Sequence, residues 1–105
     1  TKIVELEKGK IKEYNVSPQD FGLEISAQDE LLGRDVKYNT KRLIMMLDGE
    51  ESAYKDMVIA NAAAAFYVAG KVRNFKNGAE LARGLIESGE AKNKLNELIR
   101  VSNYV

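Results

Sequence analysis

One polar residue, Asn61, interrupts the most apolar stretch of the sequence, and an amide at such a place could contact a ligand. Asn61 is followed directly by four alanines. An amide buried in an apolar helix needs hydrogen-bond partners, because leaving it unpaired costs about 1–3 kcal/mol. The small alanines allow neighbouring helices to pack closely. We therefore favour a structural hydrogen bond from Asn61 to a neighbouring loop or helix terminus over a ligand contact.

Four short charged stretches invite comparison with known sites. Asp20-Phe21-Gly22 matches the magnesium motif of protein kinases, but the other kinase motifs are missing and the match is attributed to chance. Residues 48–52 lack the alternating oxygen ligands of a calcium loop and predict a solvated turn before a helix. The basic clusters at residues 8–10 and 41–42 are no phosphate-binding loop and predict exposed surface. We therefore assign no catalytic, cofactor-binding or metal-binding residue.

The composition excludes several further kinds of chemistry. The 105 residues contain neither histidine nor cysteine, which removes the commonest general base, thiol nucleophiles, disulfides and thiolate metal sites. Sixteen basic and sixteen acidic side chains cancel, so binding to nucleic acid or to a membrane is not expected. The absence of cysteine and of a signal peptide predicts a cytoplasmic protein. Since the chain begins at Thr1 rather than at methionine, we interpret it as a fragment or a processed chain.

The N-terminal residues predict two strands. Residues 2–6 and 11–16 alternate apolar and polar side chains, with Gly9 in the turn between them; this pattern is typical of a β-hairpin. Two strands alone are marginal in water, so the hairpin should belong to a larger sheet. Single helical turns are expected after Ser17-Pro18, ending at Gly22, and over residues 26–33.

The rest of the chain predicts four helices that pack on that sheet. They cover residues 36–47, 53–69, 75–88 and 90 to about 101, and the first three end at or near a glycine. Asp35, Ser52 and Asn74 are the expected N-caps of the first three. We expect an α/β fold in which residues 1–105 form a single unit.

Several stretches, in this order and spacing, are similar to one family. They are residues 11–14 and 17–23, Asn39, residues 43–49, 56–65, 68–70, 78–83 and 86–91, and Lys94-Leu95. The Pro18-to-Leu23 turn and the run that begins at Asn61 are specific together. They resemble the C-terminal part of the α/β domain of anthranilate phosphoribosyltransferase, over essentially the whole chain. The implied fold is that of a fragment of a domain like those of nucleoside phosphorylases and phosphoribosyltransferases.

The resemblance implies an activity for the parent protein. That family transfers the phosphoribosyl group of phosphoribosyl pyrophosphate to anthranilate, in tryptophan biosynthesis. It implies a homodimer, a Gly-Thr-Gly-Gly-Asp phosphate loop, and magnesium (Mg) bound by an Asp-Glu pair. These motifs are absent here, and the Asp-Glu pair would fall shortly before Thr1. The resemblance therefore implies an inactive fragment with a structural role, whose partner is the remainder of its own polypeptide.

Two alternatives share this architecture. One is a non-catalytic relative that binds nucleic acid, which the neutral charge disfavours. The other is a related nucleoside phosphorylase, which fits the helix-by-helix spacing less well. A phosphate loop and an Asp-Glu pair in the preceding sequence would decide for the transferase.

Overall fold

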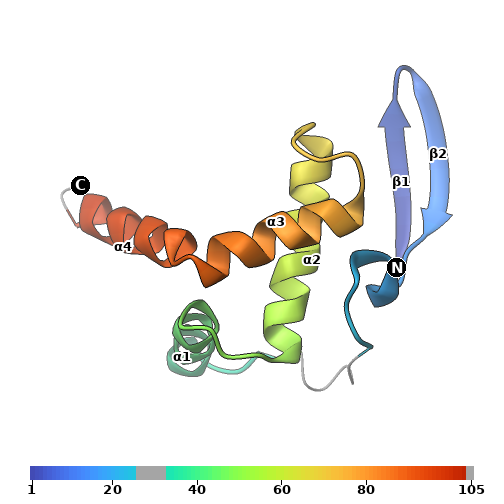
Figure 1. Cartoon of the computed structure of the whole chain (residues 1–105). Coiled ribbons are helices and arrows are strands. Elements are labelled where there is room, and N and C mark those ends of the chain that lie inside the picture. The colour runs from blue at the N-terminus through green and yellow to red at the C-terminus, as the bar shows by residue number, and fades with distance from the viewer. Residues whose placement is uncertain (26–32, 104–105) are drawn as a thin grey trace.

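The computed structural model describes residues 1–25 and 33–103. A β-hairpin comes first, a short 3-10 helix follows, and four α-helices complete the described part of the chain (Figure 1). The bounds are β1 Lys2–Glu7, β2 Lys10–Asn15, η1 Pro18–Phe21, α1 Val36–Leu47, α2 Ala53–Val68, α3 Phe75–Glu87 and α4 Glu90–Ser102. The predicted hairpin and the four predicted helices are confirmed. The larger sheet stays a prediction, and the turn predicted over residues 26–33 lies largely outside the described residues.

The hairpin forms because its turn residues accept left-handed backbone conformations. Lys8 and Gly9 have φ angles of 51° and 76°, as a two-residue turn with two positive φ angles requires. The antiparallel register pairs Lys2 with Asn15 and Glu7 with Lys10. Since side chains alternate between the two faces of a strand, one face looks toward the helices and the other carries exposed apolar side chains. The exposed apolar residues of the hairpin are Val4, Leu6 and Ile11.

Local hydrogen bonds fix where the helices begin. The side chains of Asp35, Ser52 and Asn74 each accept a hydrogen bond from a backbone N–H in the first turn of α1, α2 and α3, which satisfies a donor that the helix leaves unpaired. All three predicted N-caps are thereby confirmed. Before them, the side chain of Asp20 accepts a hydrogen bond from the backbone N–H of Ser17 and closes the turn of η1.

The core lies where α3 crosses α2. Ala63 and Ile59 of α2 are fully buried, and Ala79 and Ala82 of α3 are nearly so. At the crossing, the backbone of Ala63 leaves no room for a side chain on Gly78. A Cβ atom there would lie 2.8 Å from the carbonyl oxygen of Ala63 and 2.9 Å from its Cα. Small residues therefore set the distance between the two helices.

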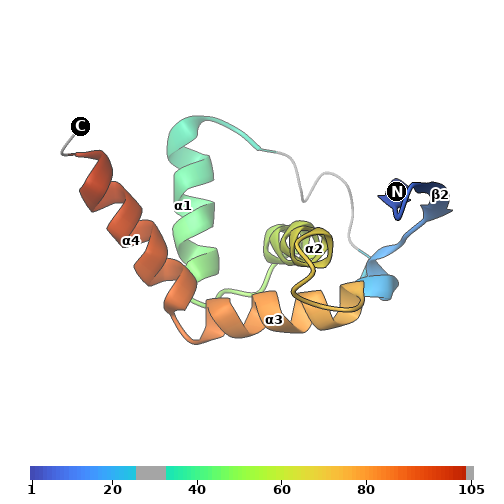
Figure 2. The same ribbon diagram turned by 90° about the horizontal axis from the view of Figure 1, so that it is seen from above.

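The other two helices extend from this core on the side away from the hairpin. Figure 2 shows α1 and α4 next to each other, with α2 and α3 between them and the strands. An ion pair between Lys92 of α4 and Asp48, the C-cap of α1, connects the two helices. None of the helices in residues 1–25 and 33–103 has both the length and the hydropathy that a bilayer span requires.

Aromatic side chains and one carboxylate attach the hairpin to the helices. The ring of Phe75, the first residue of α3, lies 4.9 Å from Tyr67, 5.1 Å from Phe21 and 6.3 Å from Tyr14, measured between centroids. Glu5 of β1 accepts hydrogen bonds from the hydroxyls of Tyr14 (2.6 Å) and Tyr67 (3.0 Å). Because Tyr67 belongs to α2, this carboxylate connects the hairpin directly to the central helix.

These hydrogen bonds shift the pKa values of all three groups. The hydroxyls of Tyr14 and then Tyr67 hold the pKa of Glu5 below its usual 4.5. In return, the Glu5 carboxylate raises the pKa of Tyr14 to about 12 and raises that of Tyr67. Glu7 and Lys12 act on the same cluster with smaller effects. The ionised carboxylate and the neutral phenols are thus the forms that the folded state favours.

Attachment of the hairpin should therefore weaken in acid. Since the pKa of Glu5 is lowered on folding, its contribution is fully present above pH 4.5 and is lost as the pH falls through the lower folded-state pKa. On the alkaline side, the contribution of Tyr14 is present below pH 10 and is lost as the pH rises through about 12. We expect the ring protons of Tyr14, shifted by Phe75 in NMR spectra, to move toward random-coil positions in acid. The Glu5→Gln variant should lose this pH dependence; an unchanged titration in that variant would contradict the assignment.

Candidate functional site

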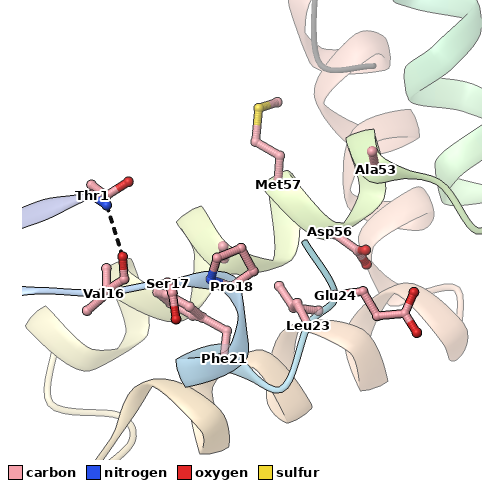
Figure 3. Close-up of a pocket in the computed structure, with 11 residues that line it drawn as sticks. Thr1, Val16, Ser17, Pro18, Phe21, Leu23, Glu24, Ala53, Asp56 and Met57 are labelled. Carbon is pink, nitrogen blue, oxygen red and sulfur yellow. Dashed lines mark hydrogen bonds between the residues drawn. The ribbon is translucent and has the colours of Figure 1, made fainter. Parts of the chain in front are cut away.

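A groove runs between the base of the hairpin, η1 and the first half of α2, and we call it the η1–α2 groove (Figure 3). Its volume is about 250 Å³. The lining residues are Thr1, Val16, Ser17, Pro18, Phe21, Leu23, Glu24, Ala53, Asp56, Met57 and Ala60. Two backbone features shape it. Pro18 opens η1 with its φ angle already fixed, and Gly22 ends η1 with a φ angle of 74°, which turns Leu23 back toward the core.

The groove is apolar over most of its length and acidic at one end. Asp56 and Glu24 stand at the acidic end, next to a second hollow of about 500 Å³ that Arg83 and Glu51 also line. The Arg83 guanidinium lies 3.8 Å from the Asp56 carboxylate and 3.4 Å from that of Glu51. Burial raises the pKa of Asp56 above its usual value, and the charge of Arg83 opposes that shift.

A buried lysine lies beneath this acidic end. Lys55 is only 1% exposed, and its Nζ donates a hydrogen bond of 2.9 Å to Glu51 Oε1. That hydrogen bond lowers the pKa of Glu51, and Arg83 adds to the effect. A buried ammonium group requires a partner of opposite charge, and the exposed carboxylate of Glu51 supplies it from the surface.

The groups in this arrangement suit binding. The carboxylates of Asp56 and Glu51 are already paired with Arg83 or Lys55. Within the described ranges, no three acidic side chains come together in a way that could hold a metal ion. The chemistry available is the burial of an apolar side chain in the groove and hydrogen bonding to the carboxylates at its end.

Comparison with known proteins shows which family this sequence belongs to. The sequence profile of the glycosyl transferase family, a/b domain, matches residues 1–92. The chain belongs to this family. Relatives named anthranilate phosphoribosyltransferase include one from Sinorhizobium medicae, 44% identical over 103 residues, which are 98% of this chain and 31% of the relative. One from Nitrosomonas europaea is 42% identical over 105 residues, 100% of this chain and 31% of the relative.

The similarity extends, at lower identity, to a further relative over nearly the whole chain. A relative of the same name from Methanobrevibacter smithii is 36% identical over 103 residues, again 98% of this chain and 31% of the relative. The chain thus spans about a third of the length of the curated relatives that it matches. The family profile ends at residue 92, near the start of α4, whereas the Nitrosomonas europaea relative aligns over the full length of α4 as well. The similarity to anthranilate phosphoribosyltransferase stated from the sequence is confirmed.

The buried environment predicted for Asn61 from the sequence is not found in the structure, so that prediction is wrong. Asn61 is exposed, and its side-chain amide donates a hydrogen bond of 3.1 Å to the carbonyl oxygen of Met57, one turn earlier in the same helix. In the part of the chain that the structure describes, this amide bonds to no loop or helix terminus. The reason is that α2 is apolar on nearly every side, so its sequence does not indicate which side faces the core.

The Asn61→Ala variant of this 105-residue chain should accordingly be no less stable. An exposed asparagine in a helix interior favours the helix less than alanine does by roughly 0.5 kcal/mol, and the hydrogen bond to Met57 is exposed to water. We expect the free energy of unfolding in urea to rise by up to about 0.5 kcal/mol. A loss of more than about 1 kcal/mol would show that the amide is a structural hydrogen bonder after all.

The remaining stretches singled out from the sequence have structural roles. Phe21 is buried in the core while Asp20 closes the turn of η1, so the kinase-like tripeptide is part of a turn. Gly49 has a φ angle of 104°, and Ser52 caps α2, as expected of a turn before a helix. Lys8 and Gly9 form the hairpin turn, and Lys10 is the first residue of β2. Of the basic pair at residues 41–42, the Arg42 guanidinium lies 4.7 Å from the ring centroid of Tyr54.

Three features of the structure went unnoticed in the sequence. They are the buried Lys55, the position of Arg83 between two acidic residues, and the hydrogen bonds from two tyrosines to Glu5. The spacing of four residues between Glu51 and Lys55 is a usable signal for an ion pair within a helix turn. The partners Glu51 and Asp56 lie 32 and 27 residues from Arg83, and Tyr67 lies 62 residues from Glu5, so no local pattern indicates these contacts. Tyr14 lies nine residues from Glu5, on the neighbouring strand of the hairpin.

Proposed function

We propose that this chain is the C-terminal part of an anthranilate phosphoribosyltransferase, which transfers the phosphoribosyl group of phosphoribosyl pyrophosphate to anthranilate in tryptophan biosynthesis. The observation that supports the proposal is the similarity to relatives of that name over nearly the whole chain, at 36% to 45% identity. The placement at the C-terminal end rests on the order of the motifs in the sequence.

In this proposal the chain supports the catalytic part and does not perform the reaction. The described residues offer no cluster of carboxylates for a magnesium ion, and neither histidine nor cysteine is present. Magnesium, phosphoribosyl pyrophosphate and anthranilate are therefore assigned to residues outside this chain, and the isolated chain is inactive. The parent is a cytoplasmic homodimer.

The partner proposed for this chain is the remainder of its own polypeptide. Leu6 and Ile11, which pair across the hairpin, are 71% and 74% exposed, and Val4 beside them is 62% exposed. The central helix α2 also has apolar residues on its outward side, such as Val68. A helix that is apolar all round is typical of the interior of a larger protein. These surfaces are where the remaining two-thirds of the relatives' length would pack.

A chimaera tests the proposed activity. In the Nitrosomonas europaea relative, the 105 aligned residues would be replaced by this chain, which aligns over its full length. We expect the chimaera to convert anthranilate and phosphoribosyl pyrophosphate to product at a rate within about tenfold of the unaltered relative. The isolated chain is the negative control. A chimaera that is monodisperse, with a cooperative thermal transition, yet shows no turnover would count against the proposed function.

A further inference from the structure

We infer that the η1–α2 groove binds the stretch of polypeptide that immediately precedes Thr1 in the complete protein. This inference rests on the proposed function, because it requires that the chain be the C-terminal part of a longer relative. It goes further by naming the surface at which the two parts meet and the segment that occupies it.

The direction of β1 brings the preceding segment to the groove. The backbone N–H of Val16 donates to the carbonyl oxygen of Thr1 (2.8 Å), and the amino group of Thr1 donates to the carbonyl oxygen of Val16 (2.9 Å). The hairpin ladder is thus still paired at Thr1, which itself lines the groove. From Thr1, β1 leads away from the labelled Pro18 and Met57 (Figure 3). A residue before Thr1 that continued the strand would therefore lie over the groove.

The pairing with β2 ends at this point, which frees the preceding backbone for other contacts. Ser17 is the N-cap of η1, and Pro18 has no backbone N–H to offer a neighbouring strand. Residues before Thr1 consequently cannot extend the ladder along the same partner. The nearest surface available to them is the side of α2 that carries Ala53, Met57 and Ala60.

The chemistry of the groove suits an apolar side chain followed by a hydrogen-bond donor. Val16, Phe21, Leu23 and Met57 supply apolar walls, and an apolar side chain gains free energy by leaving water for such a surface. The carboxylates of Glu24 and Asp56 at the far end accept hydrogen bonds. The relatives have the required length, since this chain accounts for only 31% of the Nitrosomonas europaea protein.

The first experiment measures whether the groove is covered in the complete protein. Because this chain has no cysteine, the Met57→Cys variant carries a single thiol in the isolated chain. The same substitution is made in the chimaera, after the cysteines of the relative's part are replaced by serine. Lys94→Cys on α4, an exposed position with 78% side-chain exposure, is the matched control.

We expect the Met57→Cys thiol to react with a soluble thiol reagent at least tenfold more slowly in the chimaera than in the isolated chain. The Lys94→Cys thiol, measured the same way, calibrates the reagent in both proteins. Equal rates for Met57→Cys in the two proteins would overturn the inference, because the groove would then be open in the complete protein.

The second experiment identifies the occupant by disulfide trapping. A cysteine is placed in turn at each of the four positions before Thr1 in the Met57→Cys chimaera, which is then oxidised. We expect an intramolecular disulfide at one or two neighbouring positions, since a disulfide requires Cα atoms within about 7 Å. A disulfide between two molecules would assign the groove to a second copy. Protection without any disulfide would assign it to another segment. Either result would overturn the inference.

The two proposals fail separately. Turnover is measured on the chimaera without added cysteines, and groove protection is measured on the cysteine variants. A chimaera that turns over substrate while its groove stays reactive would support the proposed function and contradict the inference about the groove. A chimaera that forms the intramolecular disulfide but shows no turnover would support the inference about the segment and contradict the proposed activity.

Discussion

Replacing Gly78 with alanine should destabilise the chain, although the same change at most helical glycines is stabilising. A Cβ atom at Gly78 would lie 2.8 Å from the carbonyl oxygen and 2.9 Å from the Cα of Ala63. Both are backbone atoms of a fully buried residue, so they cannot rotate away as a side chain would. Overpacking of this kind costs about 1–3 kcal/mol. We expect a loss of that size in the free energy of unfolding, measured in urea.

Gly84 provides the matched control in the same helix. A Cβ atom there would have no neighbour within 4 Å, so Gly84→Ala should gain about 0.5–1 kcal/mol from helix propensity alone. The two substitutions should therefore change the stability of the chain in opposite directions. If Gly78→Ala were as stabilising as Gly84→Ala, the close crossing of α2 and α3 would not exist in solution.

Removing the carboxylate of Glu51 should cost more than an exposed ion pair normally does. Its partner Lys55 is 1% exposed, whereas the Glu51 side chain is 66% exposed. The Glu51→Ala variant leaves a buried ammonium group without its hydrogen-bond acceptor. A fully buried pair would lose 3–5 kcal/mol, and water reaches this one from the Glu51 side, so we expect about 1–3 kcal/mol.

A second substitution should recover most of that loss. In the Glu51→Ala, Lys55→Met double variant, the buried charge is replaced by an apolar side chain of similar length, and such a replacement is often neutral or stabilising. We expect the double variant to unfold in urea within about 1 kcal/mol of the original chain. Equal instability of the single and double variants would mean that Glu51 acts through Arg83 rather than through Lys55, since those are its two partners.

The sequence predicts this fold well wherever local interactions determine it. The capping side chains Asp35, Ser52 and Asn74 and the turn at Gly9 are decided by residues within four positions, and each was found where expected. Helix ends differ by one residue: α2 ends at Val68 and α3 at Glu87, where Ala69 and Ser88 were predicted. That difference is within the range in which helix ends fray.

Features that depend on tertiary contacts could not be predicted. Asn61 looked buried because its neighbours are apolar, but α3 covers the side of α2 that carries Ala63 and leaves Asn61 in water. Nothing in the sequence indicates that Lys55 is buried, since lysine almost never is, yet it is 1% exposed. The groove combines Thr1, the turn of η1 and α2, which together span more than 50 residues of the chain, and no periodicity brings such segments together.

The hydrogen bond between Tyr67 and Glu5 joins residues 62 positions apart in the chain. The contacts of α3 with α2 and of β1 with β2 close much shorter loops, and the entropy lost on closing a loop grows with its length. During folding, the hairpin and the pair of helices should therefore form first and the hairpin should join the helices last. Amide hydrogen exchange would show that order as weaker protection in β1 and β2 than in α2. During synthesis on the ribosome, the face of the hairpin that carries Glu5 and Tyr14 would stay uncovered until α2 and Phe75 emerge.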